Sequence, residues 1–270
     1  VPGEDVVDVL VTGEDVETIR HPRVETEATH GSGCTLSSAI ATRLAHGDAL
    51  STAVHTGVDL LARAVRYGVD VGEGPGAVHH MVAIRDRAER QPTAERVSEA
   101  VGQFVRRDVS PLVPEVGMNV VGATPYAEVP AECAAVEGRI TRTLDGVSPN
   151  RGVRFGASSH VARFLLAARE FDPGLRFAVN CRFDDDVEAA LDALDGPVVE
   201  YDRADEPEAL REEEGRTMGW AARRAFEAAD GTPVAAFDRG DVGKEPVVRL
   251  LARDSTALVD RTLTLLDALK

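Results

Sequence analysis

Residues 152–163 read Gly-Val-Arg-Phe-Gly-Ala-Ser-Ser-His-Val-Ala-Arg and predict a strand that turns directly into a helix. Residues 153–155 have the composition of a strand end, and Gly156 permits a tight turn. Ser158 or Ser159 can then cap the helix. The first backbone N–H groups of a helix have no acceptor within it, and the positive end of the helix dipole lies at the same place. This stretch is therefore a candidate site for phosphate or diphosphate.

Three basic side chains surround this predicted helix start. Arg154, His160 and Arg163 add donors that could bind the same anion as the backbone N–H groups. The alternative is a capped helix that binds nothing and carries a histidine on its surface. The pattern alone fits both interpretations.

Strands and helices alternate on both sides of this stretch. Apolar alternation predicts strands at residues 117–124, 134–143, 176–183, 198–201, 234–238 and 246–251. Helices are predicted up to residue 171 and at residues 185–194, 207–229 and 254–269. Strands separated by helices in this way are typical of an α/β domain with a mostly parallel sheet.

A partial α/β segment, a hairpin followed by two helices, is predicted in front of this domain. Alternation in residues 6–12 and 16–24 predicts a β-hairpin around Gly13-Glu14-Asp15. One helix is then expected to end at Gly47, and a second is expected at residues 49–67.

The two predicted units are joined by a charged segment. Residues 85–94 are rich in arginine and contain Gln91-Pro92, a composition that suggests a linker. Thr93 is expected to cap the helix that follows. We therefore expect one unit at residues 1–84 and another at residues 95–270, as the length of the chain suggests.

The chain is strongly acidic. Its 270 residues include 46 aspartates and glutamates against 30 lysines and arginines, so the formal net charge is −16. This charge repels nucleic acid and anionic membrane surfaces, and neither is expected as a partner. Only two basic residues are lysines, Lys244 and Lys270. This balance suggests a halophilic protein, because salt at 1 M screens self-repulsion over roughly 3 Å. The alternative explanation is an acidic composition that arose without adaptation to salt.

Cysteine content and hydropathy favour an intracellular, cytoplasmic protein. Cys34, Cys133 and Cys181 lie far apart, so no disulfide framework or Cys-x-x-Cys metal site is expected. No apolar run approaches the ~20 residues of a membrane-spanning helix, and no signal peptide begins the chain. The chain begins in a predicted strand, which suggests the back part of a longer polypeptide.

A second glycine-containing turn lies in the front unit. Gly31, Ser32 and Gly33 allow consecutive N–H groups to line a concavity at a helix start, which suits the charge that develops on a transferred phosphoryl group. Cys34 follows in that positive field as a candidate base for a substrate hydroxyl. The alternative is a small buried cysteine in a tight turn.

Residues 29–39, with the hairpin before them and the helices after them, resemble the C-terminal end of hydroxymethylpyrimidine-phosphate kinase, a member of the ribokinase-like superfamily. The resemblance is specific, because this branch has cysteine, like Cys34 here, where most of the superfamily has aspartate. It implies that residues 31–34 form the anion hole and that Cys34 occupies the catalytic-base position. Since it covers only residues 1–84, ATP-dependent turnover is expected only from an intact kinase domain.

Three further features of the second unit could do chemistry. Arg139 and Arg142 lie three apart in a predicted strand, so they are expected to point to opposite faces. The loop Gly-Asp-Val-Gly-Lys-Glu-Pro at residues 240–246 holds Lys244, although it could be a plain connecting loop. Residues 184–186, Asp-Asp-Asp, could bind Mg²⁺, but carboxylates at a helix start also complement the helix dipole without a metal.

Short motifs of the second unit carry a second resemblance. They are Gly117-Met118-Asn119, Glu137-Gly138-Arg139, Phe155-Gly156-Ala157-Ser158-Ser159-His160, Asn180-Cys181-Arg182 and Gly243-Lys244-Glu245-Pro246. With them, residues 95–270 resemble the archaeal-type thiamine-phosphate synthase domain, which is commonly fused behind this kinase. The resemblance implies that the essential arginine and histidine are Arg139 and His160, with Arg142 as a close competitor for the arginine.

This second resemblance implies that hydroxymethylpyrimidine diphosphate condenses with hydroxyethylthiazole phosphate and releases pyrophosphate. An arginine would bind the departing diphosphate together with N–H donors near Ser158, and His160 would donate a proton or hydrogen bond to the same oxygens. Asn180 is a further candidate for substrate binding, and Lys244 could hold either the thiazole phosphate or the diphosphate. Mg²⁺ is expected with a diphosphate leaving group, with unknown ligands.

A different class of function stays open. Similar domains serve as metabolite sensors attached to DNA-binding modules, although no basic helix-turn-helix is visible in this sequence. The front segment could also act as a dimerisation or docking surface, so a homo-oligomer stays open as well.

Overall fold

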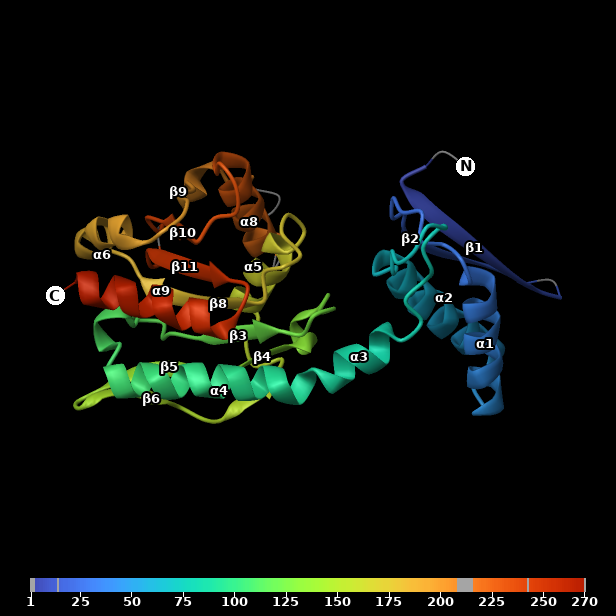
Figure 1. Ribbon diagram of the computed structural model, residues 1–270, viewed down its shortest axis with the longest axis horizontal. Coiled ribbons are helices and arrows are strands. Elements are labelled where there is room, and N and C mark those ends of the chain that lie inside the picture. The colour runs from blue at the N-terminus through green and yellow to red at the C-terminus, as the bar shows by residue number, and fades with distance from the viewer. Residues whose placement is uncertain (1–2, 14, 208–215, 242, 270) are drawn as a thin grey trace. The chain divides into compact units, whose positions relative to one another are not determined.

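The structure is a computed structural model that describes residues 3–13, 15–207, 216–241 and 243–269. The chain divides into two compact units, Val1–Arg87 and Ala88–Lys270 (Figure 1). Among the described residues, no helix has both the length and the apolar character needed to cross a membrane.

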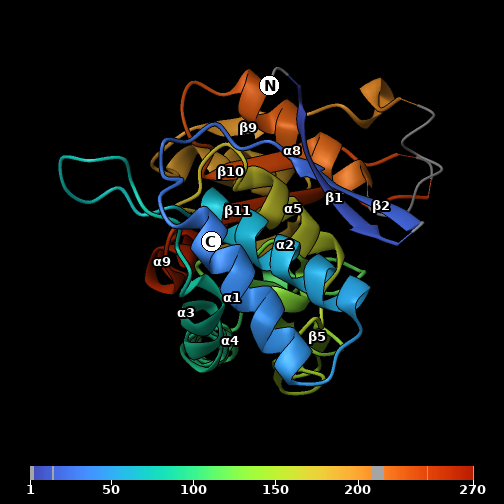
Figure 2. The same cartoon turned by 90° about the vertical axis from the view of Figure 1, so that its right-hand side faces the viewer.

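The first unit contains a β-hairpin and two helices, as predicted. Strands β1 (Asp5–Thr12) and β2 (Asp15–Pro22) pair antiparallel along their whole length. The predicted turn between them includes Glu14, which lies outside the described residues. Helices α1 (Ser32–Ala45) and α2 (Leu50–Arg66) lie side by side (Figure 2), and α3 (Val82–Ala88) follows later in the chain.

A seven-stranded sheet forms the centre of the second unit (Figure 1). Its strands, in chain order, are β3 (Val120–Ala123), β4 (Cys133–Val136), β7 (Val153–Phe155), β8 (Phe177–Arg182), β9 (Val198–Glu200), β10 (Ala235–Asp238) and β11 (Val247–Ala252). Their order across the sheet is β7-β4-β3-β8-β11-β10-β9. Among these described strands, each neighbouring pair is antiparallel except β9 and β10, which are parallel.

The predicted α/β class is confirmed, but the prediction of a mostly parallel sheet is wrong. Residues 124–132 join β3 to β4, and residues 239–246 join β10 to β11. Connections this short reverse the chain between neighbouring strands, whereas a parallel crossover needs about a dozen residues or more. Apolar alternation does not reveal strand direction, so the lengths of these connections were the better guide.

The predicted strand at residues 134–143 is interrupted at its middle. Gly138 and Arg139 have positive φ angles of 78° and 70°, a conformation that a strand does not use. The interruption ends β4 and begins β5 (Ile140–Thr143), which pairs with β6 (Gly146–Pro149) in a separate hairpin. Arg139 therefore lies in a turn and not in a strand.

Helices cover both faces of the main sheet. Helices α4 (Arg90–Arg107), α6 (Asp185–Ala190) and α9 (Ser255–Ala268) contribute to the core on one face, and α5 (His160–Ala168) and α8 (Arg216–Ala228) contribute to the core on the other. Part of the helix predicted at residues 207–229, namely residues 208–215, lies outside the described residues.

The predicted cap of α4 is wrong. Thr93 lies inside the helix, which begins three residues earlier at Arg90, and its side chain is buried. Its hydroxyl accepts a hydrogen bond from Arg176 Nη2 at 3.1 Å. The charged residues before Thr93 favour helix as much as linker, and α4 extends through them.

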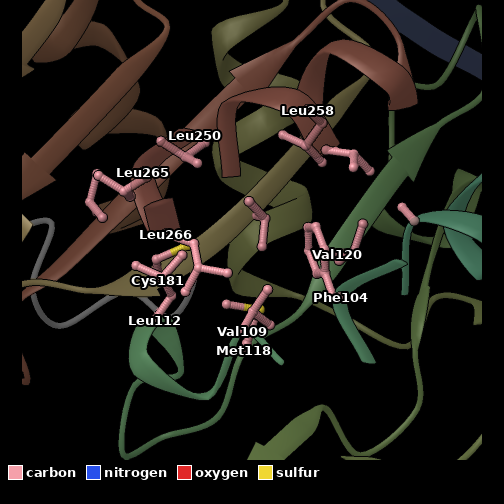
Figure 3. Close-up of a cluster of buried hydrophobic side chains, with 14 of the residues drawn as sticks. Phe104, Val109, Leu112, Met118, Val120, Cys181, Leu250, Leu258, Leu265 and Leu266 are labelled. Atoms are coloured by element: carbon pink, nitrogen blue, oxygen red, sulfur yellow. The ribbon is translucent and has the colours of Figure 1, made fainter. Parts of the chain in front are cut away.

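The sheet separates two layers of core. Figure 3 shows the layer beneath α4 and α9, which includes Phe104, Met118 and Leu250. The layer beneath α5 and α8 includes Phe164 and Leu251. Neighbouring residues of one strand enter opposite layers, as Leu250 and Leu251 do, so a polar residue in a strand can be assigned to a layer by counting in twos.

Candidate functional site

A cavity of about 510 Å³ lies on the face of the sheet that α5 and α8 cover. Its wall is built from the residues before β3, the turn after β4, the start of α5 and the loop before β11. The predicted site residues that line it are Arg139, Ser158, Ser159, His160, Asn180 and Lys244. The structure thus brings together groups from five separate sequence motifs, because Gly117 lines the same cavity.

Side-chain alternation explains why polar groups gather on this face. Asn180 lies two residues after Ala178, and Arg249 lies two residues before Leu251. Ala178 and Leu251 both belong to the core layer beneath α5 and α8. Because alternate residues of a strand share a face, Asn180 and Arg249 face the same layer. The cavity forms where polar side chains replace the apolar ones of that layer.

Arg139 and His160 line this cavity from two different segments. Arg139 lies in the turn after β4, where its guanidinium donates a hydrogen bond to the carbonyl of Val116. His160 is the first residue of α5, and its Nδ1 lies 3.2 Å from the Ser159 hydroxyl. A cation and an imidazole thus lie in the wall of the same cavity.

The start of α5 has the geometry of an anion site, although the predicted side-chain cap is absent. Ser159 occupies the N-cap position but makes no capping hydrogen bond through its side chain. Along α5, the first N–H that reaches back to a carbonyl one turn earlier is that of Arg163, to Ser159 at 2.9 Å. The preceding N–H groups lie at the positive end of the helix dipole, beside Ser158 in the cavity wall.

Four predicted residues do not belong to the wall of the cavity: Arg142, Arg154, Gly156 and Arg163. The Arg142 guanidinium instead donates to the carbonyl of Val113. Arg154 is exposed and lies 3.5 Å from the Glu137 carboxylate. The competition between Arg139 and Arg142 is therefore decided for Arg139 as far as the cavity is concerned.

Two asparagines fix the wall beside Arg139. Asn180 Oδ1 accepts from the Asn119 backbone N–H at 2.7 Å, and Asn180 Nδ2 donates to the Gly117 carbonyl at 3.1 Å. The Asn119 side chain bonds to both the N–H and the carbonyl of Val136. Asn180 was predicted to bind substrate; both ends of its amide bind the backbone, so it also holds the segment that accepts the hydrogen bond of Arg139.

A buried charged cluster in the same wall was missed from the sequence. The Asp238 carboxylate, which is 0% exposed, accepts from Arg203 Nε at 2.5 Å, from Arg203 Nη2 at 3.0 Å and from Arg249 Nη1 at 3.2 Å. The Tyr201 hydroxyl donates to Asp238 at 2.7 Å and accepts from Arg249. Arg203 and Arg249 line the cavity. An arginine in the otherwise apolar run of β11 was the available signal.

Burial and the neighbouring positive charges shift the pKa of Asp238 in opposite directions. Burial would raise the pKa of Asp238, but the hydrogen bond from Arg203 and the charges of both arginines outweigh it and lower the pKa below its ordinary value. Burial raises the pKa of the Tyr201 hydroxyl, so this group stays protonated as a donor. Asp238 is therefore ionised at neutral pH and holds two guanidinium groups in place.

The loop at residues 240–246 connects two antiparallel strands and also contributes to the cavity. Asp241 and Lys244 exchange backbone hydrogen bonds of 3.1 and 2.8 Å, and Lys244 Nζ lies 3.8 Å from the Glu206 carboxylate. The Glu245 carboxylate accepts from the N–H groups of Glu115 at 2.7 Å and Val116 at 3.1 Å. Glu245 thus joins this loop to the opposite wall. Val242 lies outside the described residues.

The aspartates at residues 184–186 are engaged in a helix start. The described residues contain no group of three or more histidine, cysteine, aspartate or glutamate side chains that could hold a metal. Asp184 instead caps α6 by accepting from the Val187 N–H at 3.0 Å, and it pairs with Arg182. The interpretation of residues 184–186 as a helix start is the one that the structure supports.

The predicted kinase motif lies at the start of α1. Gly31 has a φ of 82°, and its carbonyl accepts from the N–H and the hydroxyl of Thr35, both at 2.9 Å. Gly31 and Cys34 line an open groove of about 590 Å³, whereas Ser32 and Gly33 do not. Cys34 is exposed, so the alternative of a buried cysteine is wrong. Cys133 and Cys181 are buried, and burial raises the pKa of Cys181 to about 12.

Two protein families match the chain. The family described as thiamine-phosphate synthase ThiN matches residues 96–264, and the family described as phosphomethylpyrimidine kinase matches residues 2–79. A crystal structure of the C-terminal domain of a phosphomethylpyrimidine kinase is similar with a TM-score of 0.64 and 32% identity. That match covers 66% of this chain and 100% of the other.

Two relatives show how the matches are distributed. A thiamine-phosphate synthase ThiN of Methanothermobacter thermautotrophicus is 35% identical over 159 residues, which cover 59% of this chain and 84% of that protein. A bifunctional thiamine biosynthesis protein ThiDN of Methanocaldococcus jannaschii is 29% identical over 263 residues, which cover 94% of this chain. This chain spans 60% of that bifunctional relative.

Proposed function

The chain belongs to the thiamine-phosphate synthase ThiN family, and on this premise we propose that it joins hydroxymethylpyrimidine diphosphate to hydroxyethylthiazole phosphate, producing thiamine phosphate and pyrophosphate. The observation that carries the proposal is the shared cavity of Arg139, His160 and the start of α5. Together they offer a cation, a proton donor and oriented N–H groups to one departing anion.

The reaction is a substitution at the methylene carbon of the pyrimidine. The lone pair of the thiazole nitrogen forms the new C–N bond, and the electron pair of the breaking C–O bond leaves with the diphosphate. Negative charge therefore grows on the diphosphate oxygens. Arg139 binds these oxygens, and the N–H groups at the start of α5 stabilise the charge as it develops. His160 donates a proton or a hydrogen bond to the same oxygens.

Mg²⁺ is proposed only as a companion of the diphosphate. Two nearby carboxylates are already engaged, Asp238 by two arginines and Glu245 by two backbone N–H groups. A divalent cation would therefore be held by diphosphate oxygens and water, as Mg²⁺ commonly is with phosphate substrates. No step of the proposed reaction depends on it.

The first unit is proposed to be a remnant of a hydroxymethylpyrimidine-phosphate kinase without turnover of its own. The kinase family matches residues 2–79, which include a hairpin, the glycine-containing turn at residues 31–33 and Cys34. ATP would be a substrate only where a complete kinase domain is present. A bifunctional parent, as in the Methanocaldococcus jannaschii relative, is part of this proposal.

We also propose a cytoplasmic setting with a high salt concentration. The net charge of −16 and the near absence of lysine support it. The expectations that nucleic acid and membranes are not partners rest on the same charge and stay predictions, as does the possible homo-oligomer. The matched family is one of synthases, which favours catalysis over metabolite sensing.

The proposed function is tested by incubating the purified chain with both substrates and Mg²⁺ and separating the products by chromatography. We expect thiamine phosphate and pyrophosphate in equal amounts. Replacement of either Arg139 or His160 by alanine should abolish most of this turnover without unfolding the protein.

A further inference from the structure

A second group of cations lines the cavity, separate from Arg139 and His160. Arg249 lies in β11, Arg203 follows β9, and Lys244 lies in the loop between β10 and β11. Arg139 and His160, in contrast, follow β4 and β7. In the sheet order, β4 and β11 are three strand positions apart. The two groups therefore arise from strands in opposite halves of the sheet.

Arg249 is held by Asp238 and Tyr201 through Nη1, and its guanidinium lies 5.1 Å from the centre of the Phe164 ring. Arg249 is 5% exposed. Its Nε is buried and has no hydrogen-bond partner among the residues that the structure describes. A buried donor of a charged group is costly to leave unsatisfied, so a ligand oxygen that accepts from it would be strongly favoured.

Arg249 shares its carboxylate partner with a second arginine. Arg203 and Arg249 share the single carboxylate of Asp238, and Lys244 lies 3.8 Å from the carboxylate of Glu206. Glu245, which lines the same wall, binds backbone N–H groups. Among the described residues, the ion pair of Arg249 is therefore the one with Asp238, which Arg203 also contacts. An anion in the cavity would add a second counter-charge for Arg249.

The reaction involves a second anion besides the diphosphate. In a direct substitution, the attacking nitrogen and the departing diphosphate lie on opposite sides of the methylene carbon. The phosphate of the thiazole substrate is attached to the attacking ring and therefore points away from the diphosphate. The two anionic ends of the substrate pair need two separate cationic groups in one cavity.

Resting on the proposed function, we propose that Arg249, assisted by Lys244, binds the phosphate monoester of the thiazole substrate, opposite the diphosphate that Arg139 binds. Asp238, Tyr201 and Arg203 position the Arg249 guanidinium, whose planar fork matches a phosphate group. The cluster is thus a specificity device that selects the phosphorylated thiazole over the free alcohol.

The test compares two acceptors in the full chain, hydroxyethylthiazole phosphate and unphosphorylated hydroxyethylthiazole. In Arg249→Gln we expect kcat/KM for the phosphorylated acceptor to fall roughly 10- to 100-fold, with little change for the free alcohol and for the KM of the diphosphate. If Arg249 had a merely structural role, kcat/KM would fall equally for both acceptors. The fold should persist, because Asp238 keeps both hydrogen bonds from Arg203. Arg249→Lys keeps the positive charge but lacks the planar guanidinium. Its kcat/KM for the phosphorylated acceptor should therefore lie between those of wild type and Arg249→Gln.

Arg253→Gln is the matched control. Arg253 follows β11 directly, pairs with Asp172 at 2.8 Å and does not line the cavity, so its loss should alter neither acceptor preference nor KM. If Arg249→Gln keeps the wild-type preference for the phosphorylated acceptor, or raises the KM of the diphosphate instead, the inference is overturned.

A binding measurement separates this inference from the proposed function. Inorganic phosphate should bind the wild-type chain in calorimetry and lose affinity roughly tenfold or more in Arg249→Gln, whereas pyrophosphate binding should depend on Arg139. If the wild-type chain forms no thiamine phosphate, the proposed function fails. A lower phosphate affinity in Arg249→Gln would still support the phosphate subsite. An unchanged phosphate affinity in that variant would overturn it.

Discussion

Arg139 and His160 line the same cavity, although one follows a strand in the interior of the sheet and the other begins the helix that follows an edge strand. The strand break at Gly138 makes this possible, because it removes Arg139 from the alternation of β4 and β5. The Val116 carbonyl then fixes the guanidinium. A cation and an imidazole from distant motifs thereby face one space.

Arg139→Ala and Arg142→Ala should have very different consequences, although the two arginines are three residues apart. Arg139→Ala removes a cavity cation, and we expect a loss of turnover on the order of 10²- to 10³-fold. Arg142→Ala removes a hydrogen bond to Val113 outside the cavity and should change turnover by roughly threefold or less. Steady-state kinetics with both substrates would decide. Equal losses in the two variants would contradict the assignment.

Glu245 should influence the reaction without contacting the reacting atoms. Its carboxylate joins the loop of Lys244 to the N–H groups of Glu115 and Val116, and the Val116 carbonyl in turn binds Arg139. Glu245→Ala should lower kcat/KM roughly tenfold by loosening both walls. Glu245→Gln retains one acceptor oxygen, so its kcat/KM should lie between those of Glu245→Ala and the wild type. Two variants that both match the wild type would show that this connection is unimportant.

Asp238 should stabilise the fold in a pH-dependent way. Its pKa is lowered in the folded protein, because the arginine contacts outweigh the effect of burial. The stabilisation is therefore fully present above the unfolded pKa of about 3.9 and is lost as the pH falls through the folded pKa. Asp238→Asn should cost about 3–5 kcal/mol at pH 7, since it removes the negative charge that two buried guanidinium groups share.

Urea unfolding of wild type and Asp238→Asn at several pH values measures this effect. The difference between the two proteins should be largest at neutral pH and shrink below about pH 4. A difference that stays constant down to pH 3 would mean that Asp238 does not stabilise the fold through its charge.

Salt should stabilise the protein if the proposed high-salt setting is correct. With a net charge of −16, molar KCl reduces the Debye length to roughly 3 Å and removes most of the repulsion between surface carboxylates. We expect the Tm to rise between dilute buffer and molar KCl. An unchanged or lower Tm would indicate an acidic composition that arose without adaptation to salt, and an equal concentration of a neutral osmolyte serves as the control for solvent exclusion.

Local pattern predicted many of the elements, but not the break in the strand at residues 134–143 or the start of α4. The turn after residue 155 follows from Gly156, which has a φ of 77°, and the hairpin of the first unit follows from its alternation. The helix after that turn begins without the predicted serine cap. Strand direction was not predictable from period alone, because alternation is the same in parallel and antiparallel strands. The short connections at residues 124–132 and 239–246 were the overlooked signal.

The charged cluster around Asp238 could not be assembled from sequence. Its members come from β10, from β11 and from the segment after β9, and only the sheet order brings them into contact. The arginine of β11 stands in an apolar run, which marks it as unusual but does not identify its partner. Likewise, Arg139 and Arg142 could not be separated until the break at Gly138 was known.

Thiamine phosphate formation by the purified chain is the most direct test of the central claim that the cavity of Arg139 and His160 is a synthase site. The account predicts that the wild type converts both substrates to thiamine phosphate and pyrophosphate, and that His160→Ala, with an unchanged circular dichroism spectrum, loses turnover by roughly 10²- to 10⁴-fold. A folded wild-type chain that forms no product, or a His160→Ala variant with wild-type turnover, would contradict it.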